Sequence, residues 1–160
     1  MHGNIELLFK GLTTASEITA LYNKILRWKK GSVRLLLEEI KGNMDLCWMV
    51  IEEGTDPKKV IPSLETKTYD RLLENGFDFD KVSRIRRRGR KIQSRKELEE
   101  SDLRYFIGKS TEELIQNIYD KVKELKRRYK IDRNNEKIQW KRREINLSKR
   151  ILLLMDHLEG

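Results

Sequence analysis

The 160-residue sequence has only one cysteine, Cys47, two histidines and two prolines. A single cysteine excludes an intramolecular disulfide and a zinc site built from several thiolates. The longest wholly apolar run, residues 46–51, is far shorter than the roughly 20 residues of a membrane-spanning helix, so we expect no membrane partner. The scarcity of proline and the 38% of charged residues favour helices.

The first ten residues lack the cationic start, apolar stretch and small-residue cleavage site of a secretory signal. We therefore expect a cytoplasmic protein in a reducing compartment. The 38% of apolar residues is enough to build one hydrophobic core in a chain of this length, so residues 1–160 are expected to form a single helical domain.

Capping signals and glycines divide the sequence into helices. Thr14 with Glu17, Ser94 with Glu97 and Ser110 with Glu113 have the spacing of a capping box. Apolar residues at intervals of three and four predict helices over residues 14–31, 32–54, 66–75, 94–108 and 110–131, a short turn at 56–62, and a last helix after residue 135. The predicted fold class is all-α, an antiparallel helical bundle of four to five main helices with short extra helices.

The formal net charge of +9 is concentrated in two blocks. Residues 81–96 contain nine basic residues and no acid, and residues 121–150 contain 13 basic and four acidic residues. The first block is too polar to have a core-facing stripe, so we expect a loop or an exposed helix there. Unless the acid-rich residues 97–120 pair with one of the blocks, such dense cations must face solvent or an anionic partner.

The common patterns of catalytic and metal sites are absent. The sequence has no HExxH, CxxC, Gly-x-Ser-x-Gly or glycine-rich phosphate loop, so we expect no metal and no cofactor. Cys47 lies in an apolar helix, where its thiol would be protonated and inert. Acidic doublets such as Glu38–Glu39 and Glu112–Glu113 point about 100° apart on a helix, so we interpret them as solvated faces or helix-start charges.

Arg150 and His157 are seven residues apart, which places them two turns along one face of the last predicted helix. This spacing resembles the R-x4-6-H motif of the HEPN superfamily of small all-helical domains. The resemblance implies a metal-independent ribonuclease, in which Arg150 and His157 meet their counterparts across a dimer and act on the RNA backbone. Ile151 departs from the pattern, because a polar residue commonly follows the arginine. The structural alternative is that His157 occupies a helix C-terminus, where the helix dipole favours a cation.

Two segments, residues 46–51 and 151–155, are apolar on every side. A helix without a polar face is either central in its bundle or covered by another chain. Since a chain of this size buries about one such helix completely, the C-terminal segment is a candidate seam of a homodimer.

We expect a non-enzymatic binding module that contacts a polyanion, with the phosphate backbone of RNA ahead of DNA because no DNA-binding motif is visible. Arginine suits phosphate through its planar fork, and aromatic residues among cations offer stacking surfaces for bases. The candidate nucleic-acid-binding residues combine these features: Arg84, Arg86, Arg87, Arg88, Arg90, Lys91, Arg95, Arg127, Arg128, Trp140, Arg142 and Arg143. Two alternatives stay open, an adaptor domain whose basic stretch meets an acidic protein surface and the HEPN-like ribonuclease.

Overall fold

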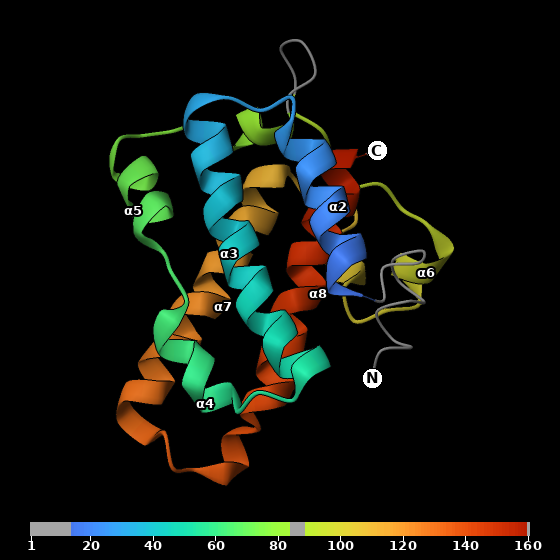
Figure 1. Ribbon diagram of the computed structural model, residues 1–160. Helices are drawn as coiled ribbons and strands as arrows, with labels where there is room; N and C mark the ends of the chain where they lie inside the picture. Colours follow the sequence, from blue (N-terminus) through green and yellow to red (C-terminus); the bar gives the residue numbers. More distant parts are fainter. Residues whose placement is uncertain (1–13, 84–88, 160) are drawn as a thin grey trace.

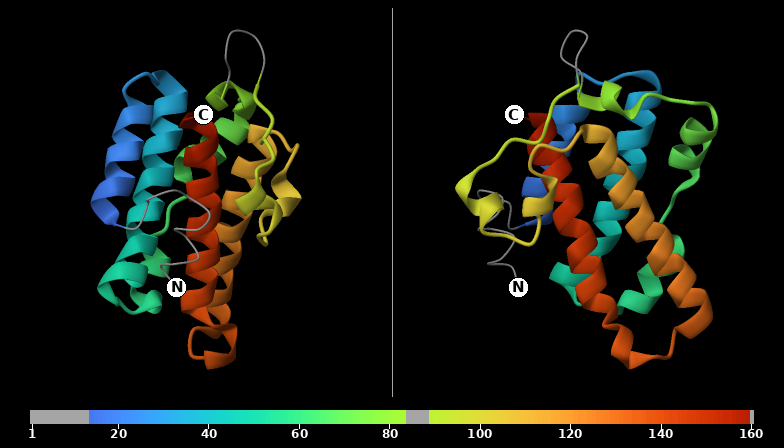
Figure 2. Two further views of the ribbon diagram at one scale, coloured as in Figure 1. Left: turned by 90° about the vertical axis from the view of Figure 1, so that its right-hand side faces the viewer. Right: turned by 180° about the vertical axis from the view of Figure 1, so that it is seen from behind.

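The computed structural model describes residues 14–83 and 89–159, which form an all-α bundle (Figure 1). Its frame consists of four long helices, α2 (Ala15–Leu26), α3 (Gly31–Glu53), α7 (Thr111–Asp132) and α8 (Trp140–Glu159). Helix α3 runs antiparallel to α2, α8 runs antiparallel to α7, and α8 lies against α2, α3 and α7 (Figures 1 and 2). The predicted all-α bundle is therefore confirmed. Over the residues that the structure describes, no helix has the length and apolar character needed to cross a membrane.

Short helices connect the long ones. After α3 come α4 (Pro57–Val60), η1 (Ile61–Ser63) and α5 (Lys67–Glu74). Before α7 come η2 (Phe79–Ser83), α6 (Lys96–Glu99) and η3 (Arg104–Phe106), and η4 (Glu136–Ile138) joins α7 to α8. Two of the predicted caps are present: the Thr14 hydroxyl accepts the Glu17 N–H at 3.2 Å, and Ser110 forms a reciprocal capping box with Glu113.

Helix α8 is the centre of the bundle. Its residues 151–155 are each at most 1% exposed, because helices on several sides cover them. The all-round apolar segment therefore packs inside its own chain. The feature that suggested a homodimer seam is accounted for by a central helix.

Glu39 of α3 caps the N-terminus of α5. The N-terminus of α5 has no side-chain cap of its own, and the Glu39 carboxylate accepts the backbone N–H groups of Thr68 at 2.6 Å and Tyr69 at 3.2 Å. The same carboxylate accepts the Tyr119 hydroxyl of α7 at 2.8 Å. This member of an acidic doublet is thus a cap supplied from another helix, a role that differs from the solvated face or helix-start charge expected from the sequence.

The helix predicted over residues 94–108 is much shorter. Only α6 and η3 are helical there, and the Ser94 hydroxyl bonds to the Glu99 carboxylate instead of capping a helix. Backbone bonds from Ile92 N–H to Lys109 C=O at 2.9 Å and from Gly108 N–H to Ile92 C=O at 2.7 Å draw the two sides of the segment together. This closure prevents a continuous helix between them.

Candidate nucleic-acid interface

The two basic blocks lie at opposite ends of α8. Arg142 is in the first turn of α8, whereas Arg95 pairs with Asp156 in its last turn, with 3.3 Å between Nη2 and Oδ2. A helix of 20 residues is about 30 Å long. The structure therefore presents two separate basic regions, at the two ends of the bundle (Figures 1 and 2).

The first block is only partly described. Four of its predicted binding residues, Arg84, Arg86, Arg87 and Arg88, lie outside the described residues. Arg90 is half-buried, its N–H donates to the Ser83 hydroxyl at 3.2 Å, and its C=O accepts the Thr111 hydroxyl at 3.3 Å. Lys91 is exposed and forms no ion pair with a described residue. The backbone just after residues 84–88 is therefore anchored to α7.

His157 belongs to this anchor. It is 7% exposed, its Nε2 lies 2.8 Å from the Thr111 hydroxyl oxygen, and that oxygen also contacts the Ser83 hydroxyl. Burial, followed by the nearby Arg90 guanidinium, lowers the pKa of His157 to about 4. The imidazole is thus neutral at neutral pH and links the end of α8 to both sides of residues 84–88.

Arg150 has a different set of partners. Its Nε donates to the Asn117 side-chain oxygen at 2.8 Å, Nη1 donates to the Asn146 C=O at 2.8 Å, and the guanidinium lies 5.9 Å from the centre of the Phe106 ring. Burial lowers the pKa of this guanidinium. Within the described part of the chain, no hydrogen bond or ion pair joins Arg150 to His157, and each is engaged in holding helices together.

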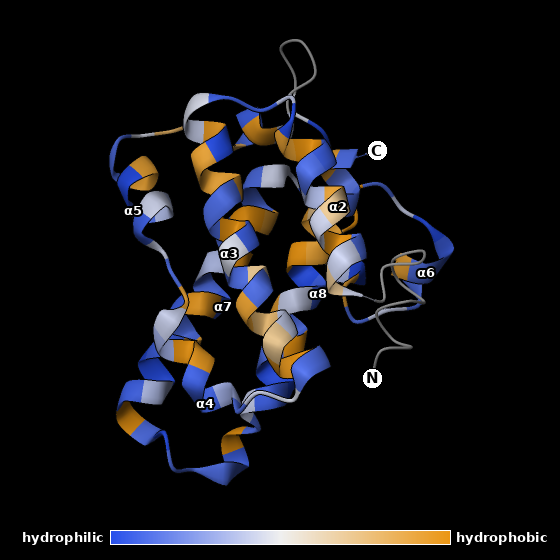
Figure 3. Cartoon of the chain, viewed as in Figure 1, coloured by the Kyte–Doolittle hydropathy of each residue, from blue (hydrophilic) through white to orange (hydrophobic). Residues whose placement is uncertain are grey.

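The second block lies where α7 ends and α8 begins, a mostly hydrophilic end of the bundle (Figure 3). Arg128 and Arg143 share the Glu124 carboxylate, at 3.2 Å and 3.3 Å. Seven other cations at this end are exposed and form no ion pair with a described residue, and we call them the basic end: Lys59, Arg127, Lys130, Arg133, Lys137, Lys141 and Arg142.

The acid-rich residues 97–120 do little to neutralise these cations. In the part of the chain that the structure describes, they supply one ion pair to the basic blocks, from Asp102 to Lys149, with 3.9 Å between the charged atoms. Its length and the exposed carboxylate indicate a weak interaction. Internal compensation by this segment is therefore minor among the described residues.

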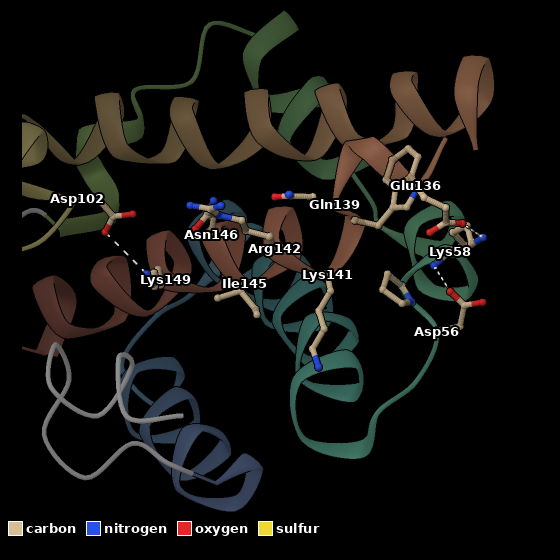
Figure 4. A pocket seen from close by; sticks show the side chains of 12 residues that line it. Asp56, Lys58, Asp102, Glu136, Gln139, Lys141, Arg142, Ile145, Asn146 and Lys149 are labelled. Carbon is tan, nitrogen blue, oxygen red and sulfur yellow. Dashed lines mark hydrogen bonds and ion pairs between the residues drawn. The ribbon is translucent and has the colours of Figure 1, made fainter. Parts of the chain in front are cut away.

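A groove of about 620 Å³ runs along α8 beside the basic end. Lys58 pairs with Glu136 at 3.5 Å at one end of it, and Lys149 faces Asp102 at the other (Figure 4). Arg142 lies between them, near Asn146 on α8 (Figure 4). The groove thus has an unpaired guanidinium and a carboxamide in its middle, a donor set that suits an anion.

A buried carboxyl group lies behind this surface. Glu144 of α8 is 0% exposed, and neither of its carboxyl oxygens has a hydrogen-bond partner. Burial, with a smaller contribution from Asp56, raises the pKa of Glu144 to about 8. It is therefore protonated at neutral pH and adds no negative charge to the basic end.

Trp140 has less accessible ring surface than its position among cations suggested. It is 4% exposed and meets Tyr129 edge-on, with 6.3 Å between ring centres, although it contributes to the wall of the groove. The candidate residues named from the sequence include Arg127 and Arg142 of the basic end but not Lys59, Lys130, Arg133, Lys137 or Lys141. Lys59 and Lys137 come from separate short helices, so no common spacing marks them in the sequence.

One group of side chains in the described residues could hold a metal ion. Ligand atoms of Asp78, Asp80 and Glu112 lie within 4.8 Å of one another. Asp80 and Asp78 already accept backbone N–H groups, of Glu112 and of Asp80, each at 3.1 Å. These bonds account for the cluster as local capping of η2 and α7.

Comparison with known proteins found no matching family model, no matching curated protein and no matching solved structure.

Proposed function

We propose that this chain is a non-enzymatic module that binds the phosphate backbone of a nucleic acid, RNA ahead of DNA, through the basic end. The observation that carries the proposal is the set of seven exposed cations without an ion pair among the described residues. They come from α4, α7, η4, α8 and the adjoining turns, so the fold gathers them from separate segments.

Electrostatics explains why such a surface favours a polyanion. Each cation that meets a phosphate releases a condensed counterion, which is the main source of affinity that does not depend on sequence. The arginines of the basic end, Arg127, Arg133 and Arg142, can each hold one phosphate through two hydrogen bonds. Glu144 behind the groove is protonated near neutral pH and adds no negative charge to this surface.

The shape of the groove beside the basic end also suits a nucleic-acid strand. The groove places Arg142 and Asn146 between two ion-paired lysines, Lys58 and Lys149, and these pairs have charged atoms 3.5 Å and 3.9 Å apart on partly exposed side chains. Ion pairs of this kind stabilise a protein by about 0–1 kcal/mol each. A phosphate group can therefore replace the carboxylate as the partner of each lysine with little loss of free energy. The groove can therefore accept a strand alongside α8.

The alternatives receive less support from the described residues. The ribonuclease hypothesis needs Arg150 and His157 at an accessible centre, but both are held by structural partners and the His157 pKa is about 4. The predicted homodimer seam in the last helix is covered within the chain. The adaptor hypothesis, in which the basic stretch meets an acidic protein surface, stays a prediction.

The test is the salt dependence of binding to a labelled single-stranded RNA, measured by fluorescence anisotropy between about 50 and 200 mM salt. For each phosphate contact, log K is expected to fall by about 0.7 per log unit of salt for a single strand. The triple variant Arg127→Gln, Lys141→Gln and Arg142→Gln should bind more weakly and lower this slope by about 2.

A matched control removes three exposed cations elsewhere. Lys67→Gln, Arg71→Gln and Arg104→Gln change the net charge by the same amount, on α5 and η3, away from the basic end. We expect this variant to keep the wild-type slope. Equal slopes for all three proteins, or no binding by the wild type at low salt, would exclude the basic end as the interface.

A further inference from the structure

Trp28 is far more exposed to solvent than the other two tryptophans. It is 78% exposed, whereas Trp48 and Trp140 are each 4% exposed. It lies in the turn between α2 and α3, next to Arg27 and Lys30, which are exposed and form no ion pair with a described residue. Burying a large apolar side chain stabilises a folded protein by about 1.5–3 kcal/mol. Trp28 is the one tryptophan of the three that does not contribute this stabilisation.

Hydrogen bonds hold the backbone of the turn that carries Trp28. The Trp28 N–H donates to Ile25 C=O at 3.4 Å, and Leu26 C=O accepts both the Lys29 N–H at 3.1 Å and Arg34 Nη1 at 3.3 Å. Fixing the backbone in advance lowers the entropy lost when a ligand packs on the ring.

Lys29 connects this turn to the first basic block. Its ammonium group donates to Val82 C=O at 2.8 Å, and burial together with the Arg90 guanidinium lowers its pKa. The α2–α3 turn and η2 therefore lie side by side at the end of the bundle opposite the basic end (Figures 1 and 2). An exposed aromatic ring in a turn with the cations Arg27, Lys29 and Lys30 has the composition of single-strand binding surfaces.

We infer that Trp28 is a stacking platform for a base of single-stranded nucleic acid, with Arg27 and Lys30 placed for the flanking phosphates. This inference rests on the proposed function and narrows it to single strands, since the bases of a duplex are stacked on one another and cannot reach the ring. Stacking on one aromatic residue is worth about 1–3 kcal/mol, which corresponds to about 5- to 150-fold in affinity.

The surroundings of Trp28 favour a base over a lipid or a protein. A membrane-surface segment presents a stripe of apolar residues, and the neighbours Arg27, Lys29 and Lys30 are all cationic. A protein hot spot sits in a ring of contacts that exclude water, whereas this indole projects from a charged turn. One ring flanked by cations is sufficient for a nucleotide, which supplies both a π-face and a charge.

The experiment compares wild type, Trp28→Phe and Trp28→Leu on oligouridine of about 12 nucleotides and on an RNA duplex of equal length. Leucine removes the stacking face and keeps an apolar side chain, so Trp28→Leu should weaken oligouridine binding about 5- to 150-fold. Trp28→Phe should fall between the two. The salt slope and the duplex affinity should be the same in all three proteins, because no phosphate contact is lost. Equal thermal unfolding checks that the variants fold.

The outcomes separate this inference from the proposed function. Salt-dependent binding that is equal in wild type and Trp28→Leu would overturn the platform and leave the basic end as the interface. No binding of either RNA by the wild type would overturn both. Binding of vesicles containing phosphatidylserine, lost in Trp28→Leu while RNA binding is unchanged, would assign Trp28 to a membrane surface and also overturn the inference.

Discussion

Replacing Glu144 with glutamine should remove a pH-dependent loss of stability. In the folded protein this carboxyl group is buried without a hydrogen-bond partner, and its pKa is raised from 4.5 to about 8. In the unfolded chain it titrates near 4.5. Between these two values the unfolded chain has released the proton while the folded protein retains it, so wild-type stability falls as pH rises.

The magnitude follows from the two pKa values. At about 1.4 kcal/mol per pKa unit, the loss reaches about 5 kcal/mol once the pH has passed the folded pKa. His157 has the opposite sign, because its pKa is lowered from 6.5 to about 4 and its stabilising effect is lost as pH falls through this range. The effect of Glu144 is therefore best separated from that of His157 between pH 6.5 and 8. Over this range the contribution of Glu144 to the free energy of unfolding changes by about 2 kcal/mol.

The assay is urea denaturation of wild type and Glu144→Gln across this window. Because glutamine does not ionise, the stability of the variant relative to wild type should grow by about 2 kcal/mol between the two ends. The exposed Glu74, which forms no ion pair with a described residue, provides the control, and Glu74→Gln should run parallel to wild type. Parallel curves for Glu144→Gln would show that this carboxyl is not buried as described.

Two further predictions concern the last helix. Thr111→Val should destabilise the protein by about 1–3 kcal/mol in urea denaturation, because it removes the hydroxyl that the buried His157 imidazole, the Ser83 hydroxyl and the Arg90 C=O all contact. Wild-type stability in this variant would refute the network. Leu154 is 0% exposed inside its own chain, so Leu154→Ala should cost about 2–5 kcal/mol independently of protein concentration. A cost that appears only where wild type is dimeric by sedimentation would contradict this expectation and support the homodimer seam.

Local signals predicted the fold well. Thr14 with Glu17 and Ser110 with Glu113 mark the true starts of α2 and α7, because these caps involve residues only three apart. The prediction was wrong over residues 94–108, where the same spacing at Ser94 produces no long helix. Pairing of Ile92 with residues 108 and 109 decides that segment, and contacts between such distant positions leave no periodic trace in the sequence.

The candidate site could be predicted only in part. The charge blocks identified Arg127 and Arg142, but their separation from Arg90 by the length of α8 depends on how the helices pack. The periodicity of apolar residues did not decide whether Trp140 would be buried, and it did not show that Trp28 would be the exposed tryptophan. The run Arg27-Trp28-Lys29-Lys30 before Gly31 was the available signal, since a helix end flanked by cations tends to lie at the surface.

Lysine acetylation with and without single-stranded RNA, read by mass spectrometry, tests the proposed interface most directly. We predict protection by RNA of Lys59, Lys130, Lys137 and Lys141, with the exposed Lys67 on α5 labelled equally in both samples. Labelling of the basic end that does not change when RNA binds, or protection of Lys67 to the same extent, would contradict the account.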